Sequence, residues 1–238
     1  MCIVVVSPKG QQFPDVTKIQ NCVDSNPDGF AMSWNEDGEV KSYKTMGHKA
    51  IVAYYKKFIK THDPMDTGLV FHARIATHGS KNIKNCHCWV SDGLGFAHNG
   101  ILSIANRGDM TDSETFFQDI FLPVYRTCGW GGAEKAVNAV IGTSKFAFID
   151  ANGDVYGFGP FKKVDGNYYS NDSYMSWEER YPSYYYGRTR RTTALTKSCV
   201  ANVDESDVDE PEPYTQAWWA RQYPEWFDDK GNLLENYD

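Results

Sequence analysis

The second residue of the chain is a cysteine, and this position gives it a chemistry that other cysteines lack. Removal of the initiator methionine, which is efficient before a small residue, leaves Cys2 with a thiol and a free α-amine. An α-amine has an ordinary pKa of about 7.7 to 8.0, so near neutral pH it can act as the base for its own side chain. The sequence therefore indicates an N-terminal nucleophile. A small core residue on a buried strand is the alternative interpretation.

A second candidate group is the arginine in residues 72–79, which read His-Ala-Arg-Ile-Ala-Thr-His-Gly. Here an apolar strand ends in polar residues followed by glycine. The planar guanidinium of Arg74 can make two parallel hydrogen bonds to a carboxylate, which suits recognition of an amino-acid α-carboxylate. A surface ion pair would use the same residue type.

The dipeptide Asn99-Gly100 follows a further apolar run at residues 94–98. The side-chain amide of Asn99 and the backbone N–H of Gly100 could point at one spot and form an oxyanion hole. Each fixed donor of this kind stabilises a transition state by about 3 to 4 kcal/mol. Asn-Gly is also the commonest dipeptide of tight turns, so a plain turn is the alternative.

Asp112 stands directly ahead of a phenylalanine-rich segment with helical spacing. Its carboxylate could bind a substrate ammonium group. The run Thr111-Asp112-Ser113-Glu114 also matches a capping box, and an acidic residue at a helix start is favourable because of the helix dipole. Both interpretations stay open on the sequence alone.

The cluster Cys86-His87-Cys88 raises the question of a metal site. Alternate-residue spacing without a second paired motif suits a structural zinc poorly, so we expect no metal and no cofactor. The six cysteines are thinly spread in a chain long enough to fold without disulfides, which indicates reduced thiols and a cytoplasmic protein.

The segments that must position these residues show both strand and helix patterns. The predicted strands are 2–7, 29–35, 39–43, 69–75, 94–98, 145–150, 154–158 and 167–170, and the predicted helices are 48–60, 113–125 and 131–141. Strands outnumber helices. This pattern favours an α+β sandwich, two sheets covered by helices, over an alternating βαβ fold.

Charge and hydropathy exclude two classes of partner. The net charge of −7 argues against direct nucleic-acid binding, because neutralising phosphates requires a surplus of Lys and Arg. The apolar run at residues 3–6 has no basic residues before it and is too short for a signal peptide or a membrane span, so we expect no membrane partner.

The composition changes near residue 175 and suggests a domain boundary there. Residues 2–174 have the pattern of one globular domain, and residues 175–238 form an extension rich in Tyr and Trp. The acidic stretch 204–212 contains two prolines and is predicted to be a disordered or loosely attached linker. The tryptophans around residues 218–226 are expected to dock on another surface.

In combination, these motifs resemble the glutaminase domain of class II glutamine amidotransferases. The resemblance rests on a cysteine at position 2, the run at 72–79, Asn-x-His at 85–87, His-Asn-Gly-Ile at 98–101 and Thr-Asp-Ser-Glu at 111–114. Their order and spacing cover about residues 2–172. The resemblance implies the four-layer αββα sandwich of N-terminal nucleophile hydrolases.

The resemblance also implies catalytic roles. Cys2 would be the nucleophile, and its own α-amine the general base and later the acid. The oxyanion hole would consist of the Asn99 side chain and the Gly100 N–H. His87 matches a family histidine to which we assign no role.

The substrate implied by the resemblance is glutamine. Arg74 would hold its α-carboxylate, with Thr77 and His78 lining the pocket beside it, and Asp112 would bind the α-ammonium. The thiolate would attack the side-chain amide, ammonia would leave, and water would hydrolyse the resulting thioester to glutamate.

The resemblance leaves the destination of the ammonia open. Full-length members carry a domain that consumes it, and the residues after 174 are too few to form one, so we expect a separate acceptor enzyme. Two alternatives remain: a hydrolase of another γ-glutamyl or amide compound, and a catalytically silent binding module of the same fold.

Overall fold

The computed structural model describes residues 2–76, 80–108 and 110–181, whose strands form two antiparallel sheets. The first sheet has six strands in the order β3-β2-β4-β1-β10-β9, and the second has four in the order β5-β6-β7-β8. The strands of the first sheet are β1 (Ile3–Ser7), β2 (Phe30–Glu36), β3 (Glu39–Thr45), β4 (Leu69–Ala73), β9 (Lys162–Val164) and β10 (Asn167–Tyr169). Those of the second are β5 (Trp89–Ser91), β6 (Leu94–Asn99), β7 (Lys145–Asp150) and β8 (Val155–Phe158).

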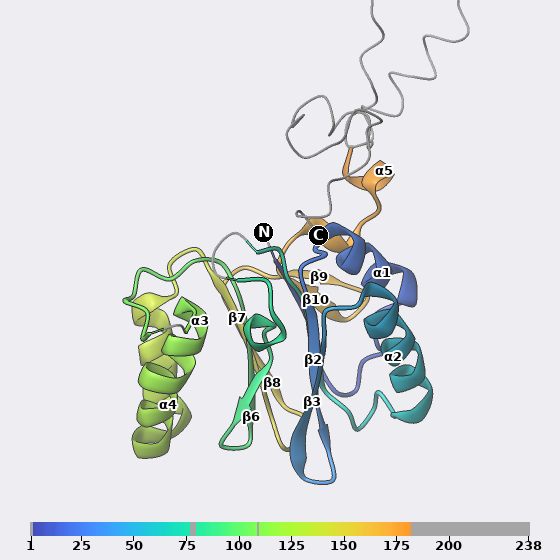
Figure 1. The fold of residues 1–238 in the computed structure, drawn as a ribbon. Coiled ribbons are helices and arrows are strands. Elements are labelled where there is room, and N and C mark those ends of the chain that lie inside the picture. Colours follow the sequence, from blue (N-terminus) through green and yellow to red (C-terminus); the bar gives the residue numbers. More distant parts are fainter. Residues whose placement is uncertain (1, 77–79, 109, 182–238) are drawn as a thin grey trace, which may run out of the picture. The chain divides into compact units, whose positions relative to one another are not determined.

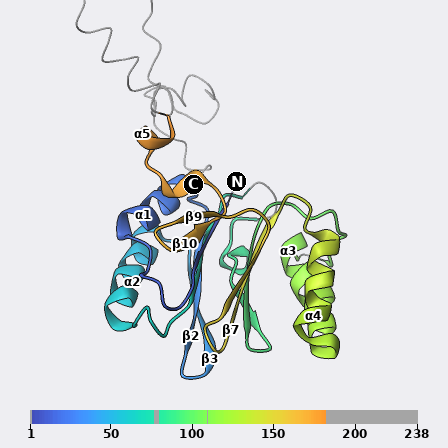
Figure 2. The same cartoon turned by 180° about the vertical axis from the view of Figure 1, so that it is seen from behind.

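Helices cover the outer face of each sheet (Figures 1 and 2). The first sheet is covered by α1 (Val16–Ser25) and α2 (His48–Thr61). The second is covered by α3 (Asp112–Thr115), the π-helical segment η2 (Phe116–Phe121) and α4 (Leu122–Val140). Three short helices complete the described part of the chain: η1 (Ile83–Asn85), η3 (Asp172–Tyr174) and α5 (Trp177–Arg180).

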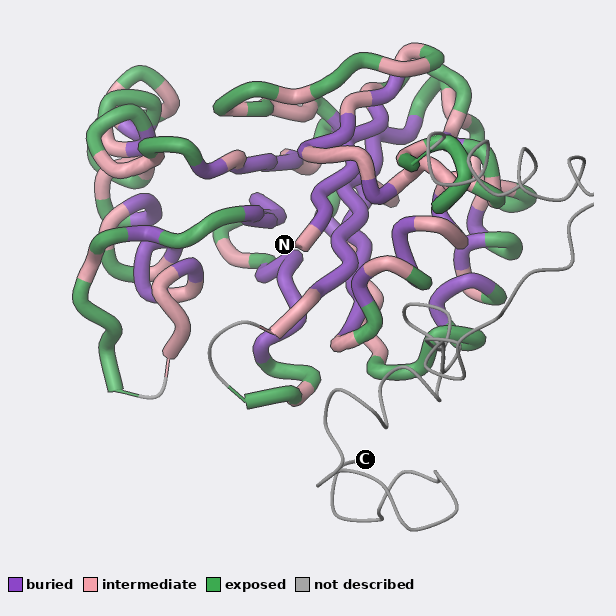
Figure 3. The backbone as a smooth tube through the Cα atoms, turned by 90° about the horizontal axis from the view of Figure 1, so that it is seen from above, coloured by how far each residue is buried: buried purple, intermediate pink, exposed green. Residues whose placement is uncertain are grey.

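Alternating side chains of the strands fill three hydrophobic layers. Ile3 and Val5 of β1 pack with the buried faces of α1 and α2, whereas Val4 and Val6 point into the layer between the two sheets. A phenylalanine-rich cluster fills the third layer, between the second sheet and its helices. Figure 3 shows the buried backbone gathered in the paired strands. The predicted αββα sandwich is therefore confirmed.

The long helices differ from the prediction in two ways. Helix α1 lies in a region where the sequence predicts no element, because only Ile19, Cys22 and Val23 are buried along its inner face. Asp15 is its N-cap residue, and the Asp15 carboxylate accepts from the N–H of Thr17 at 2.7 Å. The two predicted helices 113–125 and 131–141 form a continuous run through η2 and α4, with a kink at Gly129, where φ is +62°.

The strand register brings several chain ends to one edge of the sandwich. β1 and β4 are antiparallel, with Ile3 opposite Ala73, so Cys2 and Arg74 both lie just beyond the same end of this pair. Ser170 directly follows β10 and bonds both to Val4 of β1 and to Asn99, the last residue of β6. Cys2 and Arg74 of the first sheet and Asn99 of the second therefore lie at the same edge of the sandwich.

The start of the predicted C-terminal extension belongs to the same body as the sandwich. Helix α5 begins with a complete capping box formed by Ser176 and Glu179, and the guanidinium of Arg180 donates to the hydroxyl of Ser25 on α1. The rest of the extension lies outside the described residues. No helix in the described ranges is both long and apolar enough to cross a membrane.

Substitution of Phe148 by alanine should lower the free energy of unfolding by about 3–5 kcal/mol, because it removes a fully buried ring from the phenylalanine-rich layer. This ring lies 4.3 Å from that of Phe121 and 4.8 Å from that of Phe96, centroid to centroid. Urea denaturation measures the change. The control is Met65→Ala, at a side chain that is 57% exposed, which should alter stability by no more than about 0.5 kcal/mol. Similar losses in both variants would contradict this packing.

Candidate active site

Cys2 is held by backbone and side-chain contacts at the edge where β1 begins. Its Sγ lies 3.4 Å from both the N and the O of Ile75, and its carbonyl accepts from the Nδ2 of Asn171 at 2.6 Å. Burial raises the pKa of the Cys2 thiol above its ordinary value. The resting thiol is therefore protonated near neutral pH, and a nucleophilic role requires a nearby base.

Arg74 extends the β2–β4 ladder by one residue and is almost fully buried. Its N–H donates to Gly29 O and its carbonyl accepts from Asp28 N, both at 2.8 Å. The Nη1 of its side chain donates to the carbonyl oxygen of Ser80 at 3.1 Å. The same oxygen accepts from the Nδ2 of Asn85 at 2.9 Å. A buried guanidinium whose orientation is fixed in this way can receive a carboxylate with little reorganisation.

The carboxylate of Asp28 contacts two residues that follow Arg74 in the sequence, Ala76 and Lys81. One carboxylate oxygen accepts from the N–H of Ala76 at 2.8 Å, and the other pairs with the Nζ of Lys81 at 2.8 Å. Thr77 and His78, predicted to line a substrate pocket, lie outside the described residues.

Asp112 begins α3 and is not the residue that caps it. Thr111 is the N-cap, and its hydroxyl accepts from the N–H of Glu114 at 3.2 Å. The Oδ2 of Asp112 accepts from Leu102 N at 2.7 Å, and Oδ1 accepts from the N and the Oγ of Ser113 at 2.8 and 3.2 Å. An ionised carboxylate has about four acceptor positions, so these three bonds orient the group and leave room for a ligand donor.

Position 100 can hold no residue larger than glycine unless its neighbours move. Its φ is +148°, and a Cβ at this position would lie 2.1 Å from Ser144 Oγ and 2.9 Å from the backbone of the same residue. Asn99 precedes it and is buried, with its Nδ2 2.9 Å from the Oγ of Ser170. Position 100 at the end of β6 therefore requires glycine.

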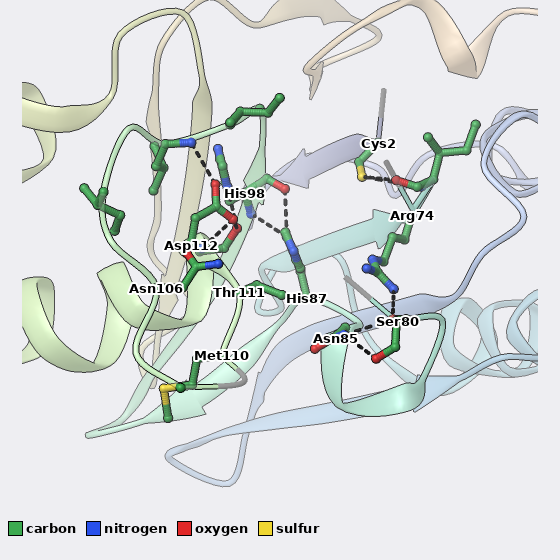
Figure 4. A pocket seen from close by; sticks show the side chains of 17 residues that line it. Cys2, Arg74, Ser80, Asn85, His87, His98, Asn106, Met110, Thr111 and Asp112 are labelled. Carbon is green, nitrogen blue, oxygen red and sulfur yellow. Dashed lines mark hydrogen bonds between the residues drawn. The ribbon is translucent and has the colours of Figure 1, made fainter. Parts of the chain in front are cut away.

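These side chains surround a cavity of about 580 Å³, a size typical of small-molecule sites. Figure 4 shows Cys2 and Arg74 on one side of it and Asp112 and His98 on the other. Four of the predicted residues line it: Cys2, Arg74, Gly100 and Asp112. Asn99 lies behind the lining, bonded to Ser170.

Several lining residues had no role in the sequence prediction. Ser80, Asn85, His98 and Ser113 line the same cavity. The Nδ1 of His98 lies 2.7 Å from Ser113 Oγ, which connects the histidine to Asp112. The motifs contain His98 and Ser113, but their mutual contact depends on the packing of β6 against α3, which no local pattern reveals.

Three buried histidines form a stack beside the cavity. The ring centroids of His72 and His87 are 4.2 Å apart and those of His87 and His98 are 6.1 Å apart, with nearly parallel planes. Burial lowers the pKa of His72 to about 3 and that of His98 to about 4, and it lowers the pKa of His87 well below the ordinary value. All three rings are therefore neutral at pH 7. Among the described residues, no group of three His, Cys, Asp or Glu side chains could hold a metal ion.

Comparison with known proteins gives likenesses of structure. No protein-family model and no curated protein matches the sequence. The chain is similar to a glutamine aminotransferase class-II domain protein from Silicibacter pomeroyi, with 15% identity and a TM-score of 0.41, over 71% of this chain and 87% of that one. It is also similar to glutamine phosphoribosylpyrophosphate amidotransferase from B. subtilis, with 15% identity and a TM-score of 0.46. That match covers 71% of this chain and 41% of the other. These likenesses concern the fold alone.

The stability of the protein should fall as the pH is lowered from about 6.5 towards 4. The unfolded chain binds protons there with its ordinary histidine pKa of 6.5, whereas the buried rings stay neutral, so protonation favours unfolding. His72→Phe keeps a stacked ring and removes one such group. It should reduce the pH dependence of the unfolding free energy by about 1.4 kcal/mol per pH unit in this window.

Urea titrations at several pH values measure this slope. Met65→Ala, which removes an exposed side chain without a titratable group, is the control and should leave the slope unchanged. A His72→Phe variant with the slope of the wild type would show that the ring is protonated in the folded protein.

Proposed function

We propose that the chain is a glutamine amidohydrolase of the class II amidotransferase type, which releases ammonia from the glutamine side chain through a cysteinyl thioester. One observation carries the proposal: Cys2, Arg74, Gly100 and Asp112 line one cavity although they come from two different sheets and a helix start. A nucleophile, a cation, an anion and a backbone donor around one small cavity are the groups that hydrolysis of a zwitterionic amide requires.

The charged groups of the cavity account for recognition of a free amino acid. The Arg74 guanidinium binds the α-carboxylate, and the oriented Asp112 carboxylate binds the α-ammonium. We assign Thr77 and His78 to the wall beside the carboxylate. A substrate that lacks either charge loses one of these charge-assisted hydrogen bonds, which weakens its binding.

The reaction begins with the transfer of a proton from the Cys2 thiol to the α-amine of the same residue, which is free once Met1 has been removed. The sulfur forms a bond to the side-chain carbonyl carbon of glutamine, and the π electrons of that carbonyl move to its oxygen. The Gly100 N–H and the Asn99 side chain stabilise this oxyanion. The raised pKa of the thiol makes a base beside it necessary, and the α-amine of the same residue is bonded to Cα, the neighbour of the Cβ that carries the sulfur.

Collapse of the tetrahedral species breaks the C–N bond. The α-ammonium gives its proton to the leaving nitrogen, and ammonia departs. Water then attacks the thioester and gives a proton to the amine. The C–S bond breaks, the sulfur takes the proton back, and the γ-carboxylic acid leaves and loses its proton to solvent to give glutamate. Atoms and charges balance without any cofactor.

We assign residues 2–174 to the glutaminase domain and infer a separate acceptor enzyme for the ammonia. The cysteines among the described residues are free thiols, which supports a reducing compartment such as the cytoplasm, where Cys2 stays reduced.

Treatment with diazo-oxo-norleucine, an electrophilic glutamine analogue, should add one molecule of the reagent to protein that has lost Met1. Cys2→Ala should abolish the adduct, because the reactive sulfur is gone. Cys128→Ala is the matched control and should leave labelling unchanged, since that thiol is exposed and distant in sequence from the motifs. Intact-mass spectrometry reads both processing and labelling. Retained Met1 without any adduct would favour the catalytically silent module.

Substitution of Arg74 by lysine should raise the KM for glutamine by roughly 10- to 100-fold with a smaller change in kcat. Lysine keeps the charge but loses the two-pronged bond to a carboxylate, and a hydrogen bond to a charged group contributes about 1.5–3 kcal/mol. Steady-state ammonia release measures both constants. Arg126→Lys is the control, because Arg126 is half-exposed and pairs with Asp92.

A glutamine analogue with hydrogen in place of the α-carboxylate tests the contact between Arg74 and the substrate by changing the substrate. Wild-type enzyme should hydrolyse this analogue poorly. If the analogue reacts as well as glutamine, the role of Arg74 and the assignment of glutamine are both wrong, and another amide is the substrate.

A further inference from the structure

Ser170 connects the strand of the nucleophile to the strand that ends in Asn99. Its Oγ lies 2.8 Å from Val4 N and 2.9 Å from the terminal nitrogen assigned to Asn99, and its own N–H donates to Val4 O at 3.0 Å. The neighbouring Asn171 donates to the carbonyl of Cys2. Residues 170 and 171 therefore fix β1 and the Asn99 carboxamide relative to each other.

The second terminal atom of Asn99, assigned as Oδ1, is buried and has no hydrogen-bond partner among the described residues. The whole residue is only 2% exposed. Leaving a buried polar atom unpaired is unfavourable, so a further hydrogen-bond partner at this terminal atom would be stabilising.

The hydroxyl of Ser170 decides which terminal atom of Asn99 occupies that position. A carboxamide fits the same heavy-atom positions with its oxygen and nitrogen exchanged. The N–H of Val4 already occupies one lone pair of Ser170 Oγ, and the hydroxyl proton needs an acceptor. Once the terminal oxygen and nitrogen of Asn99 are exchanged, the amide oxygen lies 2.9 Å from Ser170 Oγ and can accept this proton.

We propose that Ser170 is a positioning residue: its hydroxyl donates to the Asn99 carbonyl and so turns the Asn99 NH₂ group towards the unpartnered position, as a donor for the oxyanion. This inference rests on the proposed function. Asn99 and His98 are successive strand residues and point to opposite faces of the second sheet. His98 contacts Ser113 on the helix side, so Asn99 faces β1 and the cysteine that precedes it.

The orientation can be read directly by neutron diffraction from crystals of the full chain exchanged into D₂O. Nuclear density for two deuterons on the terminal atom far from Ser170, with the Ser170 deuteron directed at Asn99, is the expected result. Nitrogen facing Ser170 would overturn the inference. This arm needs no substrate, so it decides the inference even if glutamine is not turned over.

The kinetic consequence is tested with Ser170→Ala in glutamine hydrolysis. We expect kcat to fall on the order of 10- to 100-fold while KM changes by less than about twofold, because the donor loses its orientation and the charged contacts at Arg74 and Asp112 remain. Ser170→Thr retains the hydroxyl and should restore kcat. An alanine variant with normal kcat, in an active wild-type background, would overturn the inference and leave the proposed function intact.

A double-variant cycle separates positioning from a general structural effect. If Ser170 acts through Asn99, then Ser170→Ala should cause no further loss of kcat in an Asn99→Ala background. Additive losses would mean that Ser170 supports the fold and does not orient the amide. Wild-type protein that lacks Met1 yet releases no ammonia would instead remove the proposed function, and the neutron density would then stand alone as the test of Ser170.

Discussion

The arrangement of the site depends on the pairing of β1 with β4 in one register. Val4 and Val6 are buried between the sheets, and Ile3 and Val5 are buried under the helices, so β1 has no solvated face. A slip of one residue would exchange these two sets of side chains. It would also move Cys2 away from Arg74, which directly follows the last residue of β4. Burial on both faces thus fixes the position of a cysteine that is not itself part of any strand.

The second constraint is the distance between the two sheets, because each contributes one half of the cavity. Small residues such as Ala31, Ala97 and Ala147 occupy the layer between them. At Gly95 of β6 a Cβ would lie 2.9 Å from Ser33 Oγ on β2, so even alanine would force a shift. Close packing here keeps the Cys2 side and the Asp112 side within reach of one small ligand.

The sequence predicts most strands and four of the cavity-lining residues because both signals are local. Alternating or β-branched runs identify strands, and residue type identifies Arg74 or Asp112 as a charged candidate. Helix α1 is not predicted because only three of its residues are buried, which is too few for a clear helical pattern. The bond between Asn99 and Ser170 joins residues far apart in the chain, so it follows only from the stacking of the two sheets, and no local pattern contains it.

Burial also selects the base. The thiol of Cys2 has a raised pKa and needs a base to ionise, yet burial lowers the pKa of His98, an imidazole that lines the same cavity, to about 4. A base of that strength is a poor proton acceptor near pH 7, where an ideal catalytic pKa lies close to the ambient pH. An α-amine with an ordinary pKa of about 7.7 to 8.0 fits that requirement. The same burial that disfavours a histidine as the base is therefore consistent with the proposed mechanism, in which the α-amine of Cys2 is the base.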